Sequence, residues 1–341
     1  MSTVQQRTAP AGPAAARPAL RLRLTPVVVV YLALVTLLVV GSVLVGLRGE
    51  VLLDQAGILN ILTRSTALGL VAIGQTMVIL TGSLDLSVAY LIGLTSLIAA
   101  ETMAGQHGMI VPGVLLALAV AAAVGLVNGL VITVLKANAF IATLGVALIL
   151  RGYLENNYTG PAGDVPRGFQ HLGYDRIGPL PVAALLMLAV AALAWWYLSR
   201  TRPGYHMYAV GGDLEVARLS GVPTRRVVVT AHVLCSLAAG LTGIYLASRL
   251  GSGAPYVGTD AGYDLESIAA VVLGGTLLAG GRGGVVGTIG GVLILATLDT
   301  IFDDLEVDPF FKDVVRGVVL ITAVALYARR MMADRTRGRL T

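Results

Sequence analysis

Apolar segments long enough to cross a lipid bilayer recur along this 341-residue chain, and they limit its possible folds more than any other feature. Crossing ~30 Å of hydrocarbon takes about 20 consecutive, mostly apolar residues. Segments that meet or approach this length lie at 26–47, 58–80, 89–101, 112–135, 139–157, 179–198, 227–249, 264–279, 285–302 and 314–328. The sequence therefore predicts an all-α, polytopic membrane protein with about ten transmembrane helices. The segments at 89–101 and 264–279 are short, which predicts broken or tilted helices.

Charge between the apolar segments predicts how the chain is organised and oriented. Residues 1–25 are rich in Pro, Ala and Arg and are predicted to form a disordered cytoplasmic tail. A transmembrane domain follows at 26–330, and a basic cytoplasmic tail at 331–341. Cytoplasmic loops carry an excess of Lys and Arg. Ten crossings then place the arginine-rich connection 199–226 and both tails in the cytoplasm, and the acidic connection 303–308 outside. We expect a multi-pass protein of the cell (inner or plasma) membrane.

Several chemistries are excluded or disfavoured by composition. The single Cys235 excludes an intrachain disulfide and a cysteine-based zinc site. The four histidines are far apart in the sequence, so we expect neither a metal site nor another cofactor. A P-loop ends in Gly-Lys, whereas Lys136 follows a leucine and Lys312 a phenylalanine. If ATP drives this protein, another polypeptide binds it. The net charge of +5 lies at the chain ends and in one loop, so no nucleic acid is expected.

An aspartate interrupts the apolar pattern in the stretch 81-TGSLDLSVA-89. A carboxylate at the bilayer centre costs about 2.5–3.5 kcal/mol on insertion scales and usually marks a site or a pathway. Two roles are open for Asp85: capping a helix that begins near Ser87, or contacting a substrate in transit. For Asp299 we expect a pairing with Arg316. The arginines near the predicted outer ends of spans are expected to act as anchors at the membrane surface; they are Arg64, Arg151, Arg249 and Arg316.

The connection 204–227 contains a predicted short amphipathic helix, "DLEVARLSG". Asp213 can cap its N-terminus, and Gly221 can end it before Pro223. Its apolar residues are Leu214, Val216, Ala217 and Leu219. Docking into a groove on a partner protein and lying on the lipid surface are both open for it. The glycine-rich stretch 274–291 is interpreted as tight turns and close helix packing.

Weak internal similarity points to an inverted repeat. The segments 124–132 and 286–294 share a VGxxxGxxI frame, and "LDLS" (84–87) resembles "YDLES" (263–267). In the predicted topology the related segments run in opposite directions. Transporters built in this way bind their substrate at the interface between the repeats.

Four stretches together resemble the membrane permeases of bacterial ATP-binding-cassette importers for monosaccharides of the ribose, xylose and galactose type. They are "GQTMVILTGSLDLSVA", "NGLVITVLKANAFIATLGVALILRGY", "AVGGDLEVARLSGV" and "DLESIAAVVLGGTLLAGGRGGVVGTIGG". The resemblance extends from about residue 55 to 330. It implies a dimer with a second permease copy or a paralogue, two ATPase subunits on the inner face and an extracytoplasmic sugar-binding protein. The chain itself would be a transport subunit and not an enzyme.

The resemblance also implies roles for particular residues. Those expected to couple to the ATPase are Gly211, Gly212, Leu214, Glu215, Ala217, Arg218, Leu219, Ser220 and Gly221, followed by Val222. Those expected along the translocation pathway are Asp85, Ser87, Asn138, Phe140, Thr143, Asp264 and Glu266. In this setting Asp85 either caps a helix beside the pathway or hydrogen-bonds sugar hydroxyls.

The sequence departs from the family pattern in four places. Ser83 and Ala89 replace glycines. Ala139 stands where proline is usual, and Asp299 where asparagine is common. These departures leave the substrate open, because specificity would lie mainly in the separate binding protein. The alternatives are a branched-chain amino-acid permease of the same superfamily, and an ion-coupled secondary transporter that uses Asp85 as its proton or sodium carrier.

Overall fold

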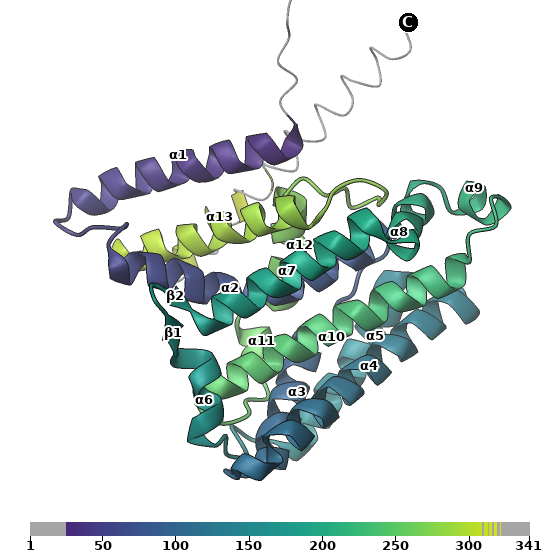
Figure 1. The fold of residues 1–341 in the computed structure, drawn as a ribbon, viewed down its shortest axis with the longest axis horizontal. Helices are drawn as coiled ribbons and strands as arrows, with labels where there is room; N and C mark the ends of the chain where they lie inside the picture. The colour runs from purple at the N-terminus through teal and green to yellow at the C-terminus, as the bar shows by residue number, and fades with distance from the viewer. Residues whose placement is uncertain (1–24, 309, 313, 316, 319–320, 322–341) are drawn as a thin grey trace, which may run out of the picture.

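The computed structural model describes residues 25–308, 310–312, 314–315, 317–318 and 321, and helices make up most of this part of the chain (Figure 1). The helices are α1 (Pro26–Gly46), α2 (Gln55–Leu80), α3 (Val88–Met103), α4 (Ile110–Val134), α5 (Ala139–Asn157), α6 (Arg167–Tyr174), α7 (Val182–Arg200), α8 (Arg202–Gly212), α9 (Leu214–Leu219), α10 (Thr224–Leu250), α11 (Val257–Asp260), α12 (Tyr263–Leu273) and α13 (Val285–Asp304). A 3₁₀ turn, His107–Met109, precedes α4. One small antiparallel hairpin pairs β1 (Arg176–Ile177) with β2 (Leu180–Pro181).

Seven helices among the described residues are long and apolar enough to cross a membrane: α1, α2, α4 with its preceding turn, α5, α7, α10 and α13. The apolar α3 is shorter, with 16 residues, and α12 has 11. The chain is therefore a polytopic, all-α membrane protein. Most of the predicted segment 314–328 lies outside the described residues, so the expected total of about ten crossings is not confirmed.

The core is built around α10, which packs most extensively on α4, α2 and α3. Most residues of α2, α10 and α13 are buried inside the protein, whereas only a minority of those in α1, α4 and α5 are buried. Helices approach closely where glycine replaces a side chain. At Gly125 of α4, for example, an added Cβ would lie 2.6 Å from the His232 carbonyl oxygen and 2.7 Å from the Val233 Cα of α10.

Helix packing around α10 has a counterpart around α2. α10 packs on α4 and α3, and α2 correspondingly packs on α13 and α12, while α2 and α10 also pack on each other. The shared glycine frame does not follow this correspondence. Residues 124–132 lie in the last turns of α4, whereas 286–294 lie in the first turns of α13. The frame therefore marks close helix packing rather than equivalent positions of two repeats.

Two stretches of irregular backbone interrupt the helical crossings, as the short segments predict. The first, 81–87, joins α2 to α3, and the second, 251–262, joins α10 to α12 and contains the single turn α11. The second stretch runs along α3: Ala254 exchanges hydrogen bonds of 3.1 and 3.2 Å with the Ser96 hydroxyl. Within a membrane, non-helical backbone is stable only where it is buried in protein or lines a water-filled cavity. Both stretches are largely covered by protein.

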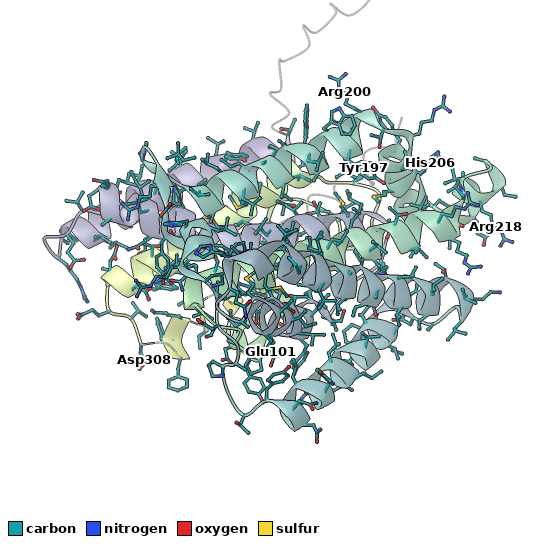
Figure 2. The ribbon with its side chains drawn as sticks, turned by 60° about the horizontal axis from the view of Figure 1, so that its bottom comes forward. Glu101, Tyr197, Arg200, His206, Arg218 and Asp308 are labelled. Atoms are coloured by element: carbon teal, nitrogen blue, oxygen red, sulfur yellow. The ribbon has the colours of Figure 1, made fainter. Side chains whose placement is uncertain are left out.

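The polar ends of the molecule differ in charge. Figure 2 shows Arg200, His206 and Arg218 toward the end that carries α8 and α9, and Glu101 and Asp308 toward the opposite end. The connection between α5 and α7, with α6 and the hairpin, belongs to the Glu101 end. There the Tyr158 hydroxyl donates a 2.9 Å hydrogen bond to Glu101.

A glycine substitution tests the packing of α4 on α10. Gly125→Ala should lower the free energy of unfolding by about 1–3 kcal/mol, because the added methyl group meets backbone atoms that cannot rotate away. Gly46→Ala is the matched control, since nothing lies within 4 Å of its Cβ position at the end of α1. The measurement is thermal unfolding in detergent, followed by fluorogenic labelling of the buried Cys235. Equal midpoints for the two variants would contradict the close approach of α4 and α10.

Candidate functional site

Asp85 lies at the centre of a buried polar cluster, which we call the Asp85 network. Its carboxylate is fully buried, as are the side chains of Ser87, Asn128 and His232. The Ser87 backbone N–H and hydroxyl donate to Asp85 Oδ1 at 3.0 and 2.6 Å. The Asn128 amide from α4 lies 3.2 Å from Oδ2 and 2.9 Å from the Ser87 hydroxyl. His232 Nδ1 from α10 lies 3.3 Å from Oδ2. A buried carboxylate is tolerated when such partners surround it.

Asp85 accepts a backbone N–H at the start of α3, as predicted, but it is not the N-cap residue. Ser87, not Asp85, is the N-cap residue of α3, and the Ser87 side chain makes no capping bond. Asp85 instead accepts the Ser87 N–H and so closes a turn at the start of the helix. Its second oxygen joins α4 and α10 through Asn128 and His232. The carboxylate is thus a crosslink between three segments of the chain as well as a turn-forming acceptor.

The sequence analysis missed both interhelical partners and a serine–histidine contact. The Ser83 hydroxyl lies 2.9 Å from His232 Nε2, so Ser83, His232 and Asp85 follow one another in the order of a hydrolase triad. Catalysis also needs access for a substrate, and here Ser83 is only 6% exposed and the other two side chains are fully buried. The arrangement is therefore a structural crosslink. The sequence does contain a signal for this crosslink: Asn128 and His232 are isolated polar residues in the apolar helices α4 and α10.

The predicted pathway residues divide into three groups. Thr143 of α5 joins the neighbourhood of Asp85, because its hydroxyl lies 3.2 Å from the Leu86 N–H. Asn138 caps α5 by accepting the Phe140 N–H at 3.0 Å, and the Phe140 ring is half exposed. The third group, Asp264 and Glu266, lies in the first turn of α12, away from the Asp85 network.

The predicted short helix of the connection 199–226 is α9, and its ends form as expected. Asp213 is its N-cap and accepts the Val216 N–H at 3.0 Å. Gly221 adopts a φ of +80°, the left-handed conformation that commonly ends a helix. Ala217 packs against the protein, whereas Leu219 is 86% exposed. Leu214 and Val216 are also mostly exposed.

Backbone contacts join α8, which precedes α9, to the start of the 81–87 stretch. A Cβ at Gly211 would lie 1.9 Å from the Leu80 carbonyl oxygen, so only glycine fits there. The same carbonyl accepts the Gly281 N–H at 3.0 Å. Gly82, two residues on, has a φ of +77°. Because α2 ends at Leu80, the connection bearing α9 is packed directly against the backbone that leads to Asp85.

The arginines expected to act as anchors make specific contacts. Arg64 pairs with Asp303, which also pairs with Lys312. Arg151 lies 2.7 Å from Glu155 on the exposed side of α5. Arg249 stacks over the Tyr174 ring at 5.5 Å. The predicted Asp299–Arg316 pair involves a residue outside the described part of the chain.

Exchanging the two polar side chains at the centre of the Asp85 network tests its role. Asn128→Asp places a second carboxylate against Asp85 and should cost about 3–5 kcal/mol of stability, as expected for an uncompensated buried charge. Asp85→Asn should cost about 1–3 kcal/mol, because one acceptor is lost but the turn with Ser87 can still form. The double variant again has one carboxylate beside one amide, so it should be more stable than Asn128→Asp alone. Thermal unfolding of the three purified variants measures this. A double variant with the summed losses would show that the two side chains are not coupled.

Comparison with known proteins identifies the family. The family model described as "Branched-chain amino acid transport system / permease component" matches residues 57–324. The chain is 41% identical over 272 residues to the ribose import permease protein RbsC of Escherichia coli (strain K12), covering 78% of this chain and 83% of the relative. It is 39% identical over 306 residues to RbsC of Bacillus subtilis (strain 168), covering 87% and 91%.

A third relative is the L-arabinose transport system permease protein AraH of Escherichia coli (strain K12), 38% identical over 269 residues, with 79% of this chain and 81% of the relative covered. No solved structure gives a significant match to the chain. The long match to the family model, the multi-pass helical fold and these relatives agree. The chain belongs to the branched-chain amino acid transport system permease family and is a membrane permease subunit of an ATP-binding-cassette importer, not an enzyme.

Proposed function

We propose that this permease translocates a neutral monosaccharide that an extracytoplasmic binding protein delivers. Relatives that match most of the chain are permeases named for the import of ribose, galactose or methyl galactoside, and L-arabinose. They support a sugar rather than the branched-chain amino acid of the family description. An ion-coupled carrier is not favoured, because the Asp85 carboxylate is enclosed and bonded on both oxygens.

The observation that carries the ATP-driven mechanism is the exposed apolar surface of α9. Leu214, Val216 and Leu219 project from a six-residue helix whose two ends are fixed by Asp213 and Gly221. Such a rigid element with apolar anchors is suited to docking in a groove of a separate ATPase. Ser220 ends the helix, and its hydroxyl is satisfied internally by the Val216 carbonyl. Glu215 and Arg218 would then lie at the polar rim.

Gly211 and Gly212 have a positional role in this proposal. Their backbone packs against Leu80 and Gly281, so a displacement of α9 would reach the end of α2 without a flexible linker between them. From there the chain continues through Ser87, whose network includes α4 and α10, and through Leu86, which contacts Thr143 of α5. We infer that this connection carries the ATPase movement to the pathway.

A second permease copy or a paralogue would cover the exposed face of α5. Its exposed apolar residues are Phe140, Ile141, Leu144, Leu148 and Ile149. Gly145 and Gly152 have open space beside them and, seven residues apart, share one face of the helix, which allows close contact with another helix. The pathway would lie at this face, with Asn138 at its inner end. Asp264 and Glu266 would lie nearer the outer end.

The proposed orientation places α8, α9 and the segments 1–25 and 331–341 in the cytoplasm, with 26–330 as the transmembrane domain. The basic residues at the α8–α9 end and the acidic residues at the other end support this orientation. Lipid would contact α1, α4 and the outer side of α7.

Substitutions on α9 test the docking of the ATPase. Leu219→Asp should reduce co-purification of the ATPase and sugar-stimulated ATP hydrolysis by about 30-fold, the loss expected for a binding anchor worth ~2 kcal/mol. Gly221→Val should act in the same direction, because a φ of +80° strains a β-branched residue. Glu215→Ala removes only a rim charge and should have a small effect.

The matched control is Leu47→Asp, which changes an equally exposed leucine at the end of α1. It should leave co-purification unchanged, and membrane insertion should be normal in all four variants. Wild-type co-purification and hydrolysis for Leu219→Asp would mean that α9 lies on the lipid surface. The ATP-driven mechanism would then lose its main structural support.

A further inference from the structure

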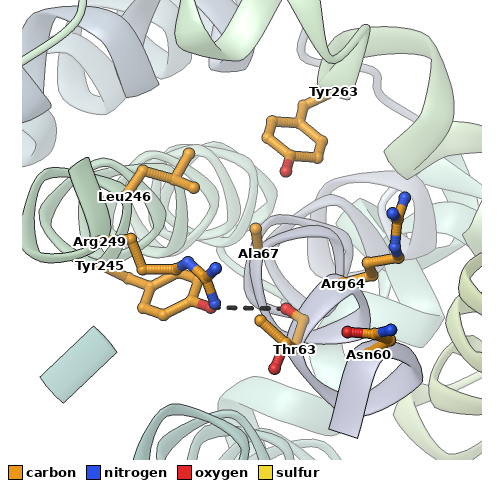
Figure 3. A pocket seen from close by; sticks show the side chains of 8 residues that line it. All are labelled: Asn60, Thr63, Arg64, Ala67, Tyr245, Leu246, Arg249 and Tyr263. Atoms are coloured by element: carbon orange, nitrogen blue, oxygen red, sulfur yellow. Dashed lines mark hydrogen bonds between the residues drawn. The ribbon is translucent and has the colours of Figure 1, made fainter. Parts of the chain in front are cut away.

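A second polar feature lies apart from the Asp85 network, at the opposite ends of α2 and α10. A cavity of about 300 Å³ is lined there by residues of α2, α10 and α12: Asn60, Thr63, Arg64, Ala67, Tyr245, Leu246, Arg249 and Tyr263 (Figure 3). In the proposed orientation this is the extracytoplasmic side. Its volume is at the lower limit of small-molecule pockets, which span about 300–1,000 Å³, and therefore suits a compact ligand.

Most of the lining side chains can form hydrogen bonds. Figure 3 shows the Tyr263 hydroxyl and the Arg249 guanidinium directed into the same space, with Asn60 and Thr63 on the α2 side. Tyr245 is held in place by a 3.4 Å hydrogen bond from its hydroxyl to the Thr63 carbonyl. Only Ala67 and Leu246 are aliphatic. The rings and side-chain stems contribute most of the exposed wall, so the cavity combines hydrogen-bonding groups with apolar faces.

Arg249 is positioned for binding by contacts outside the cavity. Its guanidinium stacks over the Tyr174 ring at 5.5 Å, and its backbone carbonyl accepts the Tyr174 hydroxyl at 2.6 Å. A guanidinium held flat in this way presents two parallel N–H groups, which can bind two adjacent oxygen atoms. The hydroxyls on neighbouring carbons of a sugar have this arrangement.

Acidic side chains lie near the two arginines of the cavity. Arg64 is paired with Asp303, which is shared with Lys312. Glu266 and Asp299 both lie close enough to act electrostatically on Tyr263. The two arginines of the lining, Arg64 and Arg249, therefore have acidic side chains in their neighbourhood. An anion would meet repulsion as well as attraction here, so the cavity fits a neutral polyhydroxylated molecule.

We propose that this cavity is a binding site for one neutral monosaccharide within a single permease subunit, on the extracytoplasmic side and separate from the exposed face of α5. The identity of the ligand rests on the proposed function, because a sugar importer must accept its substrate on this side. The Tyr263 ring would pack on a C–H face of the sugar, and Arg249 and Asn60 would bind its hydroxyls, with the buried Tyr245 supporting the wall behind them. The site gives the sugar a first position in the permease after it leaves the binding protein.

Direct binding to the purified permease in lipid nanodiscs, without the binding protein, tests this site. D-ribose, D-galactose and L-arabinose are titrated separately by saturation-transfer NMR, with inorganic phosphate as a competitor. At least one sugar should bind, and phosphate should not displace it. Tyr263→Phe should weaken binding about tenfold, as expected when the loss of one hydrogen bond costs ~1.4 kcal/mol.

Two further variants separate a loss of the site from a loss of folding. Ala67→Leu fills the cavity with an apolar side chain and should abolish binding, whereas Ala67→Ser keeps the volume and should not. Tyr205→Phe is the control for Tyr263→Phe, because Tyr205 is an exposed tyrosine of α8. Binding that is unchanged in Tyr263→Phe and Ala67→Leu would overturn the proposal, as would the absence of binding for all three sugars or displacement by phosphate.

Different results would reject the proposed function and the proposed sugar site. Absence of sugar binding to the wild-type permease, with normal ATPase co-purification, would reject the cavity and leave the importer intact. Sugar binding to a permease that recruits no ATPase would reject the ATP-driven mechanism and leave the cavity.

Discussion

The burial of the Asp85 carboxylate is the constraint on which the half of this structure nearest α8 and α9 depends. A charge without exposure to water requires donors on all sides, and the Ser87 backbone, Asn128 and His232 supply them. Each donor comes from a different part of the chain, so satisfying one carboxylate fixes the positions of α3, α4 and α10 together. The irregular backbone at 81–87 is stable for the same reason, because its polar groups are bonded within protein rather than exposed to lipid.

The Asp85 network lies between the α8–α9 connection and α5. The 81–87 stretch begins at Leu80, whose carbonyl is in close contact with Gly211 and bonded to Gly281, and it ends beside Thr143 of α5. α9 is thus connected to the buried side of α5 through short, packed contacts that end at the Thr143 hydroxyl. In the proposed mechanism this connection would carry a displacement of α9 to the pathway, as a permease driven by a separate ATPase requires. The cavity near Tyr263 lies at the far ends of α2 and α10, so the same two helices bear both the Asp85 network and the proposed sugar site.

The sequence predicted the helical segments well because hydropathy alone determines whether a segment can cross a bilayer. α5 has the predicted bounds, and Asp213 and Gly221 delimit α9 as expected, since capping depends on local chemistry. Contacts between distant helices could not be predicted in this way. Asn128 and His232 are 104 residues apart in the sequence and both reach Asp85 only because α4 packs on α10 in one register. The pairing of Arg64 with Asp303 and the cavity beside Tyr263 depend on tertiary packing in the same manner.

The central claim is that Asp85 holds the permease together and that ATP, not an ion gradient, drives transport. The most direct measurement is D-ribose uptake into proteoliposomes that contain the permease with its ATPase and binding protein, comparing the wild type with Asp85→Asn. We predict uptake that requires ATP on the ATPase side, persists in the presence of proton and sodium ionophores, and is largely retained in Asp85→Asn. Uptake that needs no ATP, collapses with an ionophore and disappears in a correctly folded Asp85→Asn variant would contradict the account.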